Sequence, residues 1–184
     1  FDSVKKFNAI VGSGGMVVMD TNTCMVEVAR FFMAFTQRES CGKCVPCREG
    51  TKRMLEILER IVEGKGVMSD LQDLEELAKM VKTMALCGLG KSAPLPVISA
   101  MENFRDEYVE HIVDKKCRAK TCAALRRYVI NPAYCKGCGR CANNCPVNAI
   151  RGTIRNPHTI DPDICIRCGT CYENCAFDAI YIDA

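Results

Sequence analysis

The chain has 184 residues, enough for one or two small domains, and it carries 15 cysteines and a formal net charge of +3. Cysteine makes up about 8% of the residues, a level found in disulfide scaffolds and in metal proteins. Three bound four-thiolate cubane clusters would add a charge of about −6, and no basic stripe is present, so binding to nucleic acid is not expected.

The spacing of the cysteines separates the two classes. Eleven of the fifteen fall in three C-x2-C-x2-C runs, two of which are extended by x3-C. Cysteines so close in sequence are poor disulfide partners, but they can wrap one metal centre. The sequence shows neither a signal peptide nor an apolar run long enough to span a bilayer, so we expect a soluble, cytoplasmic protein.

Residues 7–20, "FNAIVGSGGMVVMD", predict a glycine-rich turn followed by a short strand. The chain begins at Phe1 and its elements start without a lead-in, so we expect it to be the C-terminal part of a longer protein. The glycines do not form a dinucleotide-binding fingerprint, because Val17 stands where that motif requires its third glycine.

Residues 21–113 predict a small four-helix bundle. Apolar residues recur at helical spacing over residues 23–37 and 48–63, and a third helix is expected to begin at Ser69, where "SDLQ" has the form of a capping box. A fourth helix is expected after "SAPLP". The residues predicted to face the core are Met25, Val28, Phe32 and Phe35, then Met54, Leu55, Leu58, Ile61 and Val62, then Leu71, Leu74, Leu77, Val81 and Met84, and finally Met101, Phe104, Tyr108 and Ile112.

Between the first two helices, "CGKCVPC" supplies three cysteines, Cys41, Cys44 and Cys47. Three thiolates complete neither a tetrahedral site nor a cubane cluster. The next cysteine downstream is Cys87, which lies beyond two helices that could pack antiparallel and bring it back. The "GLGKS" tail after it does not complete a phosphate loop, because Ala85 stands where that motif requires a glycine.

Residues 114–127 lack a periodic apolar face and predict a linker, yet they form part of a candidate zinc site. The pattern His-x5-Cys-x4-Cys comprises His111, Cys117 and Cys122. Three thiolates and an imidazole make a closed structural zinc site, and Cys24 is the candidate fourth ligand. The alternatives are two free thiols, a fourth iron–sulfur cluster, and a merely buried helical residue for Cys24. Zinc here would hold the C-terminal domain to the bundle or serve as its pivot.

From Tyr128 onward the chain repeats itself with an offset of 30 residues: "YVINPAYCKGCGRCANNCPVNAI" aligns with "HTIDPDICIRCGTCYENCAFDAI". Each half predicts a strand, a ligand loop, a short helix and a second strand. Where two C-x2-C-x2-C-x3-C runs occur together, the first three cysteines of each run wrap one cubane cluster. The fourth cysteine of that run then ligates the cluster of the other run. One predicted set is Cys135, Cys138, Cys141 and Cys175, and the other is Cys165, Cys168, Cys171 and Cys145. Two zinc sites would not require this interleaving, and His158 is expected to be a surface residue.

Two resemblances to known families follow from these motifs. Residues 128–184 resemble the bacterial two-cluster ferredoxin, and Pro146 follows Cys145 as in that motif, whereas Ala176 follows Cys175. "GSGG", "ESCGKCVPCREGT" and "CGLG" resemble the helical cluster-binding domain of the NADH-binding flavoprotein subunit of complex I. This second resemblance implies one [4Fe-4S] cluster on Cys41, Cys44, Cys47 and Cys87, and it implies that residues 1–20 end a preceding β domain.

The fusion of the two parts is similar to the β subunit of NAD(P)-linked, electron-bifurcating [FeFe]-hydrogenases and of related formate dehydrogenases. That resemblance implies FMN and NAD(P) sites upstream of this region. It also implies a thioredoxin-like [2Fe-2S] subunit and a catalytic hydrogenase subunit as partners, with soluble ferredoxin as a further candidate.

We therefore expect an α+β chain: a helical domain (21–113) with one [4Fe-4S] cluster, a linker (114–127) and a 2[4Fe-4S] ferredoxin domain (128–184). Its expected role is electron transfer through three clusters inside an oxidoreductase, with no catalytic residue of its own. The alternatives are a subunit of an NAD-dependent formate dehydrogenase, a stand-alone polyferredoxin and a structural zinc-binding module.

Overall fold

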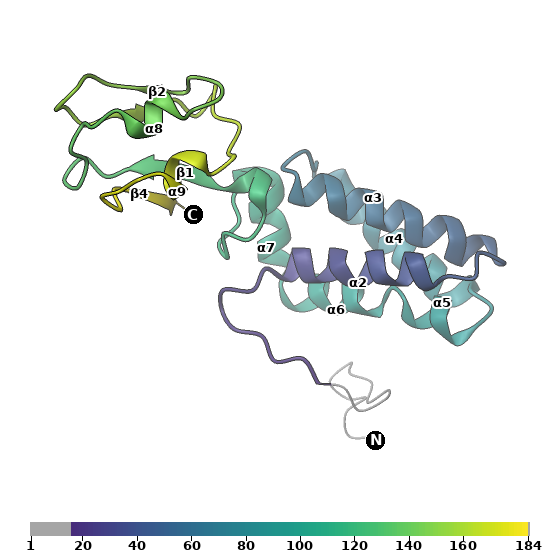
Figure 1. Cartoon of the computed structure of the whole chain (residues 1–184). Coiled ribbons are helices and arrows are strands. Elements are labelled where there is room, and N and C mark those ends of the chain that lie inside the picture. Colours follow the sequence, from purple (N-terminus) through teal and green to yellow (C-terminus); the bar gives the residue numbers. More distant parts are fainter. Residues whose placement is uncertain (1–15, 184) are drawn as a thin grey trace.

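The computed structural model describes residues 16–183 and forms two lobes, one helical and one small and β-containing (Figure 1). The predicted strand within residues 7–20 is not seen in residues 16–20, and the rest of that segment lies outside the described residues. Across the described part of the chain, no helix is both long and apolar enough to cross a membrane.

The helical lobe packs four main helices around one apolar core. Helix α2 (Met25–Glu39) contacts α3 (Thr51–Val62) and α6 (Leu95–Asn103), and α4 (Ser69–Met84) contacts both α3 and α6. Its largest fully buried side chains include Met33, Met54, Leu58, Leu74 and Tyr108. Shorter elements join these helices: η1 (Pro46–Gly50), α5 (Gly88–Ser92), α7 (Arg105–Val109) and η2 (Glu110–Asp114).

The face by which α2 joins the core differs from the prediction. The helix buries Val26, Ala29, Met33 and Thr36, whereas the predicted Phe35 is 48% exposed. Apolar residues cover a broad arc of this helix. Spacing alone therefore does not distinguish the predicted face from the adjacent face that the structure buries. The small side chains at positions 26 and 29 let the neighbouring helices approach closely, and this selects the observed face.

Three further local predictions were wrong. The third helix begins at Ser69 as predicted, but Ser69 is not its N-cap; instead the carboxylate of Asp70 accepts a hydrogen bond from the Val67 N–H (2.9 Å) and pairs with Arg60. The predicted fourth helix is broken at Phe104, whose backbone leaves the helical region (φ −135°, ψ 36°) and separates α6 from α7. Phe104 is consequently 39% exposed, while Tyr108 stays buried. Met84 was also predicted to be in the core but is exposed at the end of α4.

The β-containing lobe confirms the predicted order of strand, loop, helix and strand in each repeat. Strand β1 (Arg127–Ile130) pairs antiparallel with β4 (Ile180–Asp183), and β2 (Ile150–Arg151) pairs antiparallel with β3 (Thr159–Ile160). Helices α8 (Arg140–Asn143) and α9 (Thr170–Glu173) follow the two ligand loops. Each sheet therefore takes one strand from each repeat, which ties the two halves into one unit.

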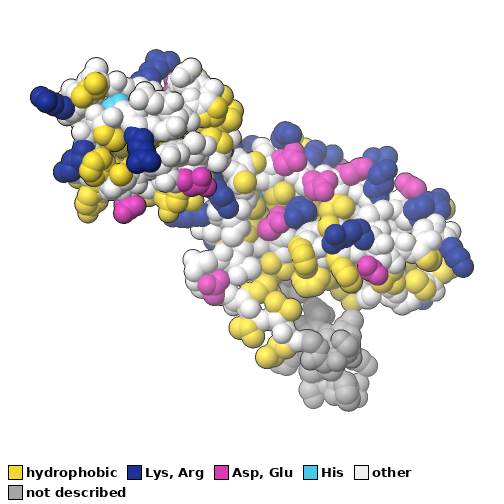
Figure 2. All heavy atoms as spheres, in the orientation of Figure 1, with side chains coloured by type: hydrophobic (Ala, Val, Ile, Leu, Met, Phe, Trp, Pro, Cys, Tyr) yellow, Lys and Arg dark blue, Asp and Glu magenta, His cyan; other side chains and the backbone are white. Residues whose placement is uncertain are grey.

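The segment between the lobes packs on the helical lobe. Cys117, Cys122 and Leu125, the last within η3 (Ala123–Leu125), are buried in the same core as α2 and α3. A contact between the lobes is the bond from the Arg167 guanidinium to the backbone oxygen of Ala124. The segment predicted to be a linker thus belongs to the helical lobe. It has no periodic apolar face, but its two cysteines lie in the core of the bundle. Figure 2 shows charged side chains of both signs scattered over the helical lobe.

Candidate cluster and metal sites

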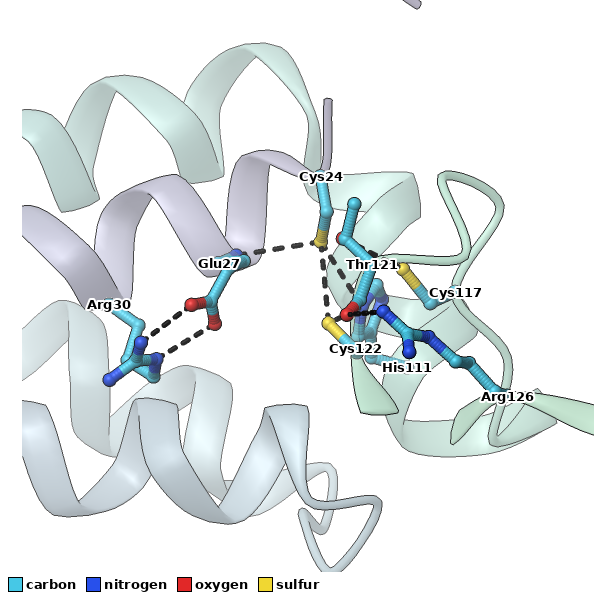
Figure 3. A network of polar contacts seen from close by, with 8 residues as sticks. All are labelled: Cys24, Glu27, Arg30, His111, Cys117, Thr121, Cys122 and Arg126. Carbon is cyan, nitrogen blue, oxygen red and sulfur yellow. Dashed lines mark hydrogen bonds and ion pairs between the residues drawn. The ribbon is translucent and has the colours of Figure 1, made fainter. Parts of the chain in front are cut away.

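Four buried side chains converge where α2, η2 and the 115–126 segment meet (Figure 3). The ligand atoms of Cys24, His111, Cys117 and Cys122 all lie within 4.8 Å of one another. Cys24 Sγ is 3.3 Å from His111 Nε2 and 3.8 Å from Cys122 Sγ, and His111 Nε2 is 3.4 Å from Cys122 Sγ. These are the four residues that the sequence singled out as zinc ligands.

The spacing matches the dimensions of a tetrahedral zinc site. Zn–S and Zn–N bonds of about 2.3 and 2.0–2.1 Å place two sulfurs about 3.8 Å apart and a sulfur and a nitrogen about 3.6 Å apart. The observed Cys24–Cys122 separation equals the first value, and the two sulfur–nitrogen separations are slightly shorter than the second. Three of the six donor–donor separations thus agree with a tetrahedral zinc site, and all six are within 4.8 Å.

The imidazole of His111 is held in the orientation that a metal ligand needs. Its Nδ1 lies 2.7 Å from the backbone oxygen of Glu107, one helical turn earlier, so Nδ1–H donates there and Nε2 is left facing the sulfurs. The Glu107 carboxylate also accepts a hydrogen bond from the Met25 N–H (3.0 Å), which joins α7 to the start of α2. Glu107 was not predicted as part of this site; its position four residues before His111 was the available signal.

The pKa values of His111, Cys117 and Cys122 reflect how closely these buried groups interact. Burial opposes a charge on His111, but its hydrogen bonds with Cys117 and Cys24 raise its pKa to about 10. Hydrogen bonds from Cys122 and Cys24 lower the pKa of the Cys117 thiol, while interaction with Cys117 raises the pKa of Cys122. Several buried groups that compete for protons are stabilised when one cation replaces those protons.

Local structure fixes each ligand of this site. Cys24 is the N-cap of α2, and its Sγ accepts from the Glu27 N–H (3.5 Å). The turn that carries the other two cysteines is closed by a bond from Lys120 N–H to the Cys117 oxygen (2.8 Å). Arg126 donates to the backbone oxygens of Lys120 and Thr121 (2.9 and 3.1 Å), which pins the loop at its far end (Figure 3).

The second candidate site is formed by the C-x2-C-x2-C loop and the segment after α4. The backbone N–H groups of Leu86 and Cys47 lower the pKa of the Cys44 thiol, so the residue just before Cys87 lies next to the loop. A Cβ added to Gly90 in α5 would lie 2.6 Å from Ala85 Cβ and 3.2 Å from Cys47 Cβ, so glycine allows α5 to approach both Ala85 and the loop. Helices α3 and α4 thus return the Cys87 segment to the Cys41–Cys47 loop, as expected.

The ferredoxin-like lobe contains two cavities, and each is lined by one of the predicted crossed sets. One cavity is lined by Cys135, Cys138, Cys141 and Cys175, together with Phe177 and His158. The other is lined by Cys145, Cys165, Cys168 and Cys171, together with Tyr128 and Val147. Burial raises the pKa of Cys171, the most enclosed ligand of the second set, to about 11.

The repeat extends to the backbone around these ligands. The Ala149 N–H donates to Cys145 Sγ and the Ala179 N–H to Cys175 Sγ, both at 3.3 Å. Gly139 and Gly169 both adopt positive φ (76° and 83°) at the start of the short helices, a conformation that favours glycine. Donated N–H groups of this kind stabilise negative charge on a ligand sulfur.

The prediction that His158 is a surface residue was wrong. Its ring is 4% exposed, and its Nδ1 lies 3.1 Å from the Asn156 oxygen. The ring folds inward because Gly152 leaves room for it: a Cβ at that position would lie 2.5 Å from His158 Cγ. The polar sequence around it, "RNPHT", indicates a surface loop, so the burial could not be foreseen from composition.

Family comparisons agree with this division of the chain. Residues 27–111 match the NADH-ubiquinone oxidoreductase-F iron-sulfur binding region. Residues 128–151 and 159–180 each match a 4Fe-4S binding domain. The two 4Fe-4S matches coincide with the two sequence repeats.

Individual relatives show the same pattern. The chain is 53% identical over 158 residues to NADP-reducing hydrogenase subunit HndC of Solidesulfovibrio fructosivorans, covering 86% of this chain and 32% of that protein. It is 42% identical over 117 residues to an F-type subunit of NADH-quinone oxidoreductase from Rhizobium meliloti, covering 64% of this chain and 28% of the relative. The chain thus spans about a third of the length of these relatives.

A solved structure has a similar fold. It is described as the crystal structure of NAD+-reducing [NiFe]-hydrogenase in the H2-reduced state and superposes with a TM-score of 0.50 at 32% sequence identity. The similarity covers 52% of this chain and 17% of that one.

Proposed function

We propose that this chain, which joins an iron–sulfur binding region of the NADH-ubiquinone oxidoreductase-F type to two 4Fe-4S binding domains, carries electrons within an NAD(P)-linked hydrogenase. The observation that carries the proposal is the presence of three four-cysteine sets in one chain that is 53% identical to a subunit of an NADP-reducing hydrogenase.

The residues at the three sites fit 4Fe-4S clusters. Thiolates are soft ligands that suit iron–sulfur clusters, and each ferredoxin cavity is lined by four of them. No aspartate or glutamate lines either cavity among the described residues, so nothing there opposes a negatively charged cluster at close range. A bound cluster would supply one-electron oxidation and reduction.

The residues of the chain hold and shield these groups. The first set comprises Cys41, Cys44, Cys47 and Cys87, the second Cys135, Cys138, Cys141 and Cys175, and the third Cys165, Cys168, Cys171 and Cys145. In each set the third cysteine of the C-x2-C-x2-C loop is buried, which keeps part of the site away from water. Backbone N–H groups beside Cys44, Cys145 and Cys175 stabilise the ligand charge.

We further propose that Cys24, His111, Cys117 and Cys122 bind zinc. Zinc does not change oxidation state, so this site would carry no electrons and would be structural. It would join the start of α2 to the segment that leads into the ferredoxin-like lobe, which supports a role in holding that lobe in place. A pivoting role rests on the same position between the lobes.

The chemistry of the whole assembly would lie mostly in other parts. The chain spans 32% of the hydrogenase relative, and we assign FMN, NAD(P) and the hydrogen reaction to regions and subunits beyond it. A thioredoxin-like 2Fe-2S subunit and a catalytic hydrogenase subunit are the proposed partners.

The test is to purify the protein with its native partners, measure bound iron, and follow cluster reduction by low-temperature EPR. Hydrogen and NAD(P)H are each expected to reduce the clusters of this chain, whereas formate is not. Reduction by formate but not by hydrogen would overturn the hydrogenase assignment, and recovery of the chain without partners, at full iron content, would favour a free carrier.

A further inference from the structure

The sequence repeat makes the two ferredoxin cavities directly comparable. Residues that line one cavity have counterparts 30 positions away that line the other: Gly139 and Gly169, Ala179 and Ala149, Ile180 and Ile150. The ligands, the backbone turns and the pairing of the strands also correspond. Any chemical difference between paired positions therefore acts on otherwise equivalent sites.

Three of the paired positions differ in charge or polarity. Lys136 and Arg140 line the cavity of Cys135, Cys138, Cys141 and Cys175, hereafter the basic cavity. Their counterparts Ile166 and Thr170 line the cavity of Cys145, Cys165, Cys168 and Cys171, hereafter the neutral cavity. The third difference is His158 in the basic cavity against Tyr128 in the neutral one, and both rings are buried.

Acidic residues just outside the cavities offset one another. Glu173 lies in α9, two residues after the neutral-set ligand Cys171, and its counterpart is the uncharged Asn143. Asp178 lies between Phe177 and Ala179, which line the basic cavity, and its counterpart is the uncharged Asn148. Arg167 follows a ligand of the neutral cavity, but its guanidinium is bonded to the Ala124 oxygen and does not line that cavity.

Two contacts act in the opposite direction. The Arg167 N–H donates to Cys165 Sγ (3.4 Å), and the Cys168 thiol lies 3.4 Å from Thr170 Oγ1, whose hydroxyl would donate to Cys168 as a cluster-bound thiolate; both bonds favour the reduced cluster. Two neutral hydrogen bonds are weaker than two full positive charges on the rim of the other cavity, even though Lys136 and Arg140 are exposed and partly screened.

We propose that the cluster in the basic cavity has the higher reduction potential of the two, and that Lys136 and Arg140 set the difference. Reduction adds one negative charge to a cluster, and positive neighbours stabilise the reduced form. With clusters bound, one electron would pass from the reduced cluster of the neutral cavity, which would be oxidised, to the oxidised cluster of the basic cavity, which would be reduced; no bond or proton would change. The inference rests on the proposed electron-transfer function.

The positions of the cavities give this difference a direction. Cys165 of the neutral set lines the pocket between the lobes together with Lys116 and Leu125, and no ligand of the basic set lines that pocket. Of the two cavities, the neutral one therefore lies nearer the helical lobe, and an electron held by this pair would come to rest in the basic cavity. The basic cavity would thus be the point from which a partner takes the electron.

The experiment is an EPR-monitored redox titration of the complete, cluster-loaded protein. The exchange Lys136→Ile with Arg140→Thr should lower the higher of the two potentials, and Ile166→Lys with Thr170→Arg should raise the lower one. We expect each exchange to change the equilibrium ratio of the electron on the two clusters by up to about tenfold. For one electron this corresponds to a change of about 59 mV in the difference between the two reduction potentials. Each single substitution is measured as well, in case a double variant does not fold.

A matched control removes two positive charges from the helical lobe, by Lys52→Ile and Lys79→Thr at exposed positions of α3 and α4. It should leave both ferredoxin potentials unchanged. Equal potentials in the unaltered protein, or an exchange that moves neither potential, would overturn the inference while leaving the electron-transfer function intact. Failure of the lobe to bind two clusters would instead overturn the proposed function.

Discussion

The proposed zinc site and the two ferredoxin cavities use the same kind of ligand in opposite ways. Cys24, Cys117 and Cys122 are all buried, they come from segments up to 98 positions apart, and their sulfurs crowd around a point. The ferredoxin ligands come from two local motifs, and most are exposed or half-buried around wider cavities. Burial and crowding suit a redox-inert ion, whereas partial exposure around a larger space suits a group that exchanges electrons.

The largest expected effect follows from removing two ligands of the buried site. The double variant Cys117→Ser, Cys122→Ser should lose about one zinc per chain and keep all its iron. Because the ion's binding energy contributes to folding, the helical lobe should lose several kcal/mol of stability. Metal analysis and thermal unfolding measure the two effects.

The control for that variant is Thr121→Ser, which lies in the same loop and leaves every ligand in place. It should keep its zinc and its melting temperature. A double variant with an unchanged zinc content would remove the contrast between the two kinds of site.

The helical lobe has a proposed cluster site of its own. A substitution at Cys87 tests this site separately from the two ferredoxin clusters. Cys87→Ser should cost about four iron atoms per chain, because a cubane that loses a ligand is not retained. The two ferredoxin clusters should keep their EPR signals. Ser92→Ala, in the short helix α5 that follows Cys87, is the control and should keep all the iron; full iron content in the Cys87 variant would contradict the proposed ligand set.

The crossing of the ferredoxin ligands can be tested by comparing pairs of variants. If Cys175 belongs to the basic cavity, Cys175→Ser and Cys141→Ser should remove the same EPR signal, and Cys171→Ser a different one. Assembly of each cluster from one local motif would instead make Cys175→Ser resemble Cys171→Ser. The readout is which signal disappears during a redox titration.

The smallest effect concerns the helical lobe alone. Asp70→Ala removes a buried carboxylate that accepts from the Val67 N–H and pairs with Arg60, and it should destabilise this lobe by about 1–3 kcal/mol. The neighbouring Asp73→Ala, on the exposed face of α4, should cost less than about 0.5 kcal/mol. Chemical denaturation followed by helical circular dichroism measures both; equal losses would mean that the Asp70 contacts are not specific.

Residue spacing predicted much of the local structure, but not the cap of α4 or the break at Phe104. The 30-residue repeat predicted the strand order of the ferredoxin-like lobe, and the cysteines that line each cavity are those that the two C-x2-C-x2-C-x3-C runs assign to one cluster. Spacing is informative here because a ligand loop must wrap a cluster within a few residues, so the chemistry dictates the spacing. The positions of the first three helices were likewise predicted from periodicity, which reflects burial of one face.

The sequence by itself determined the ligand types, the repeat and the division into two lobes, since these depend on neighbours along the chain. Only the tertiary structure decided that α2 buries Ala29 and not Phe35, that His158 turns inward against Gly152, and that Cys24 meets His111 at 3.3 Å. Each of these depends on the packing of segments distant in sequence, where volume and close approach select among patterns that are equally periodic.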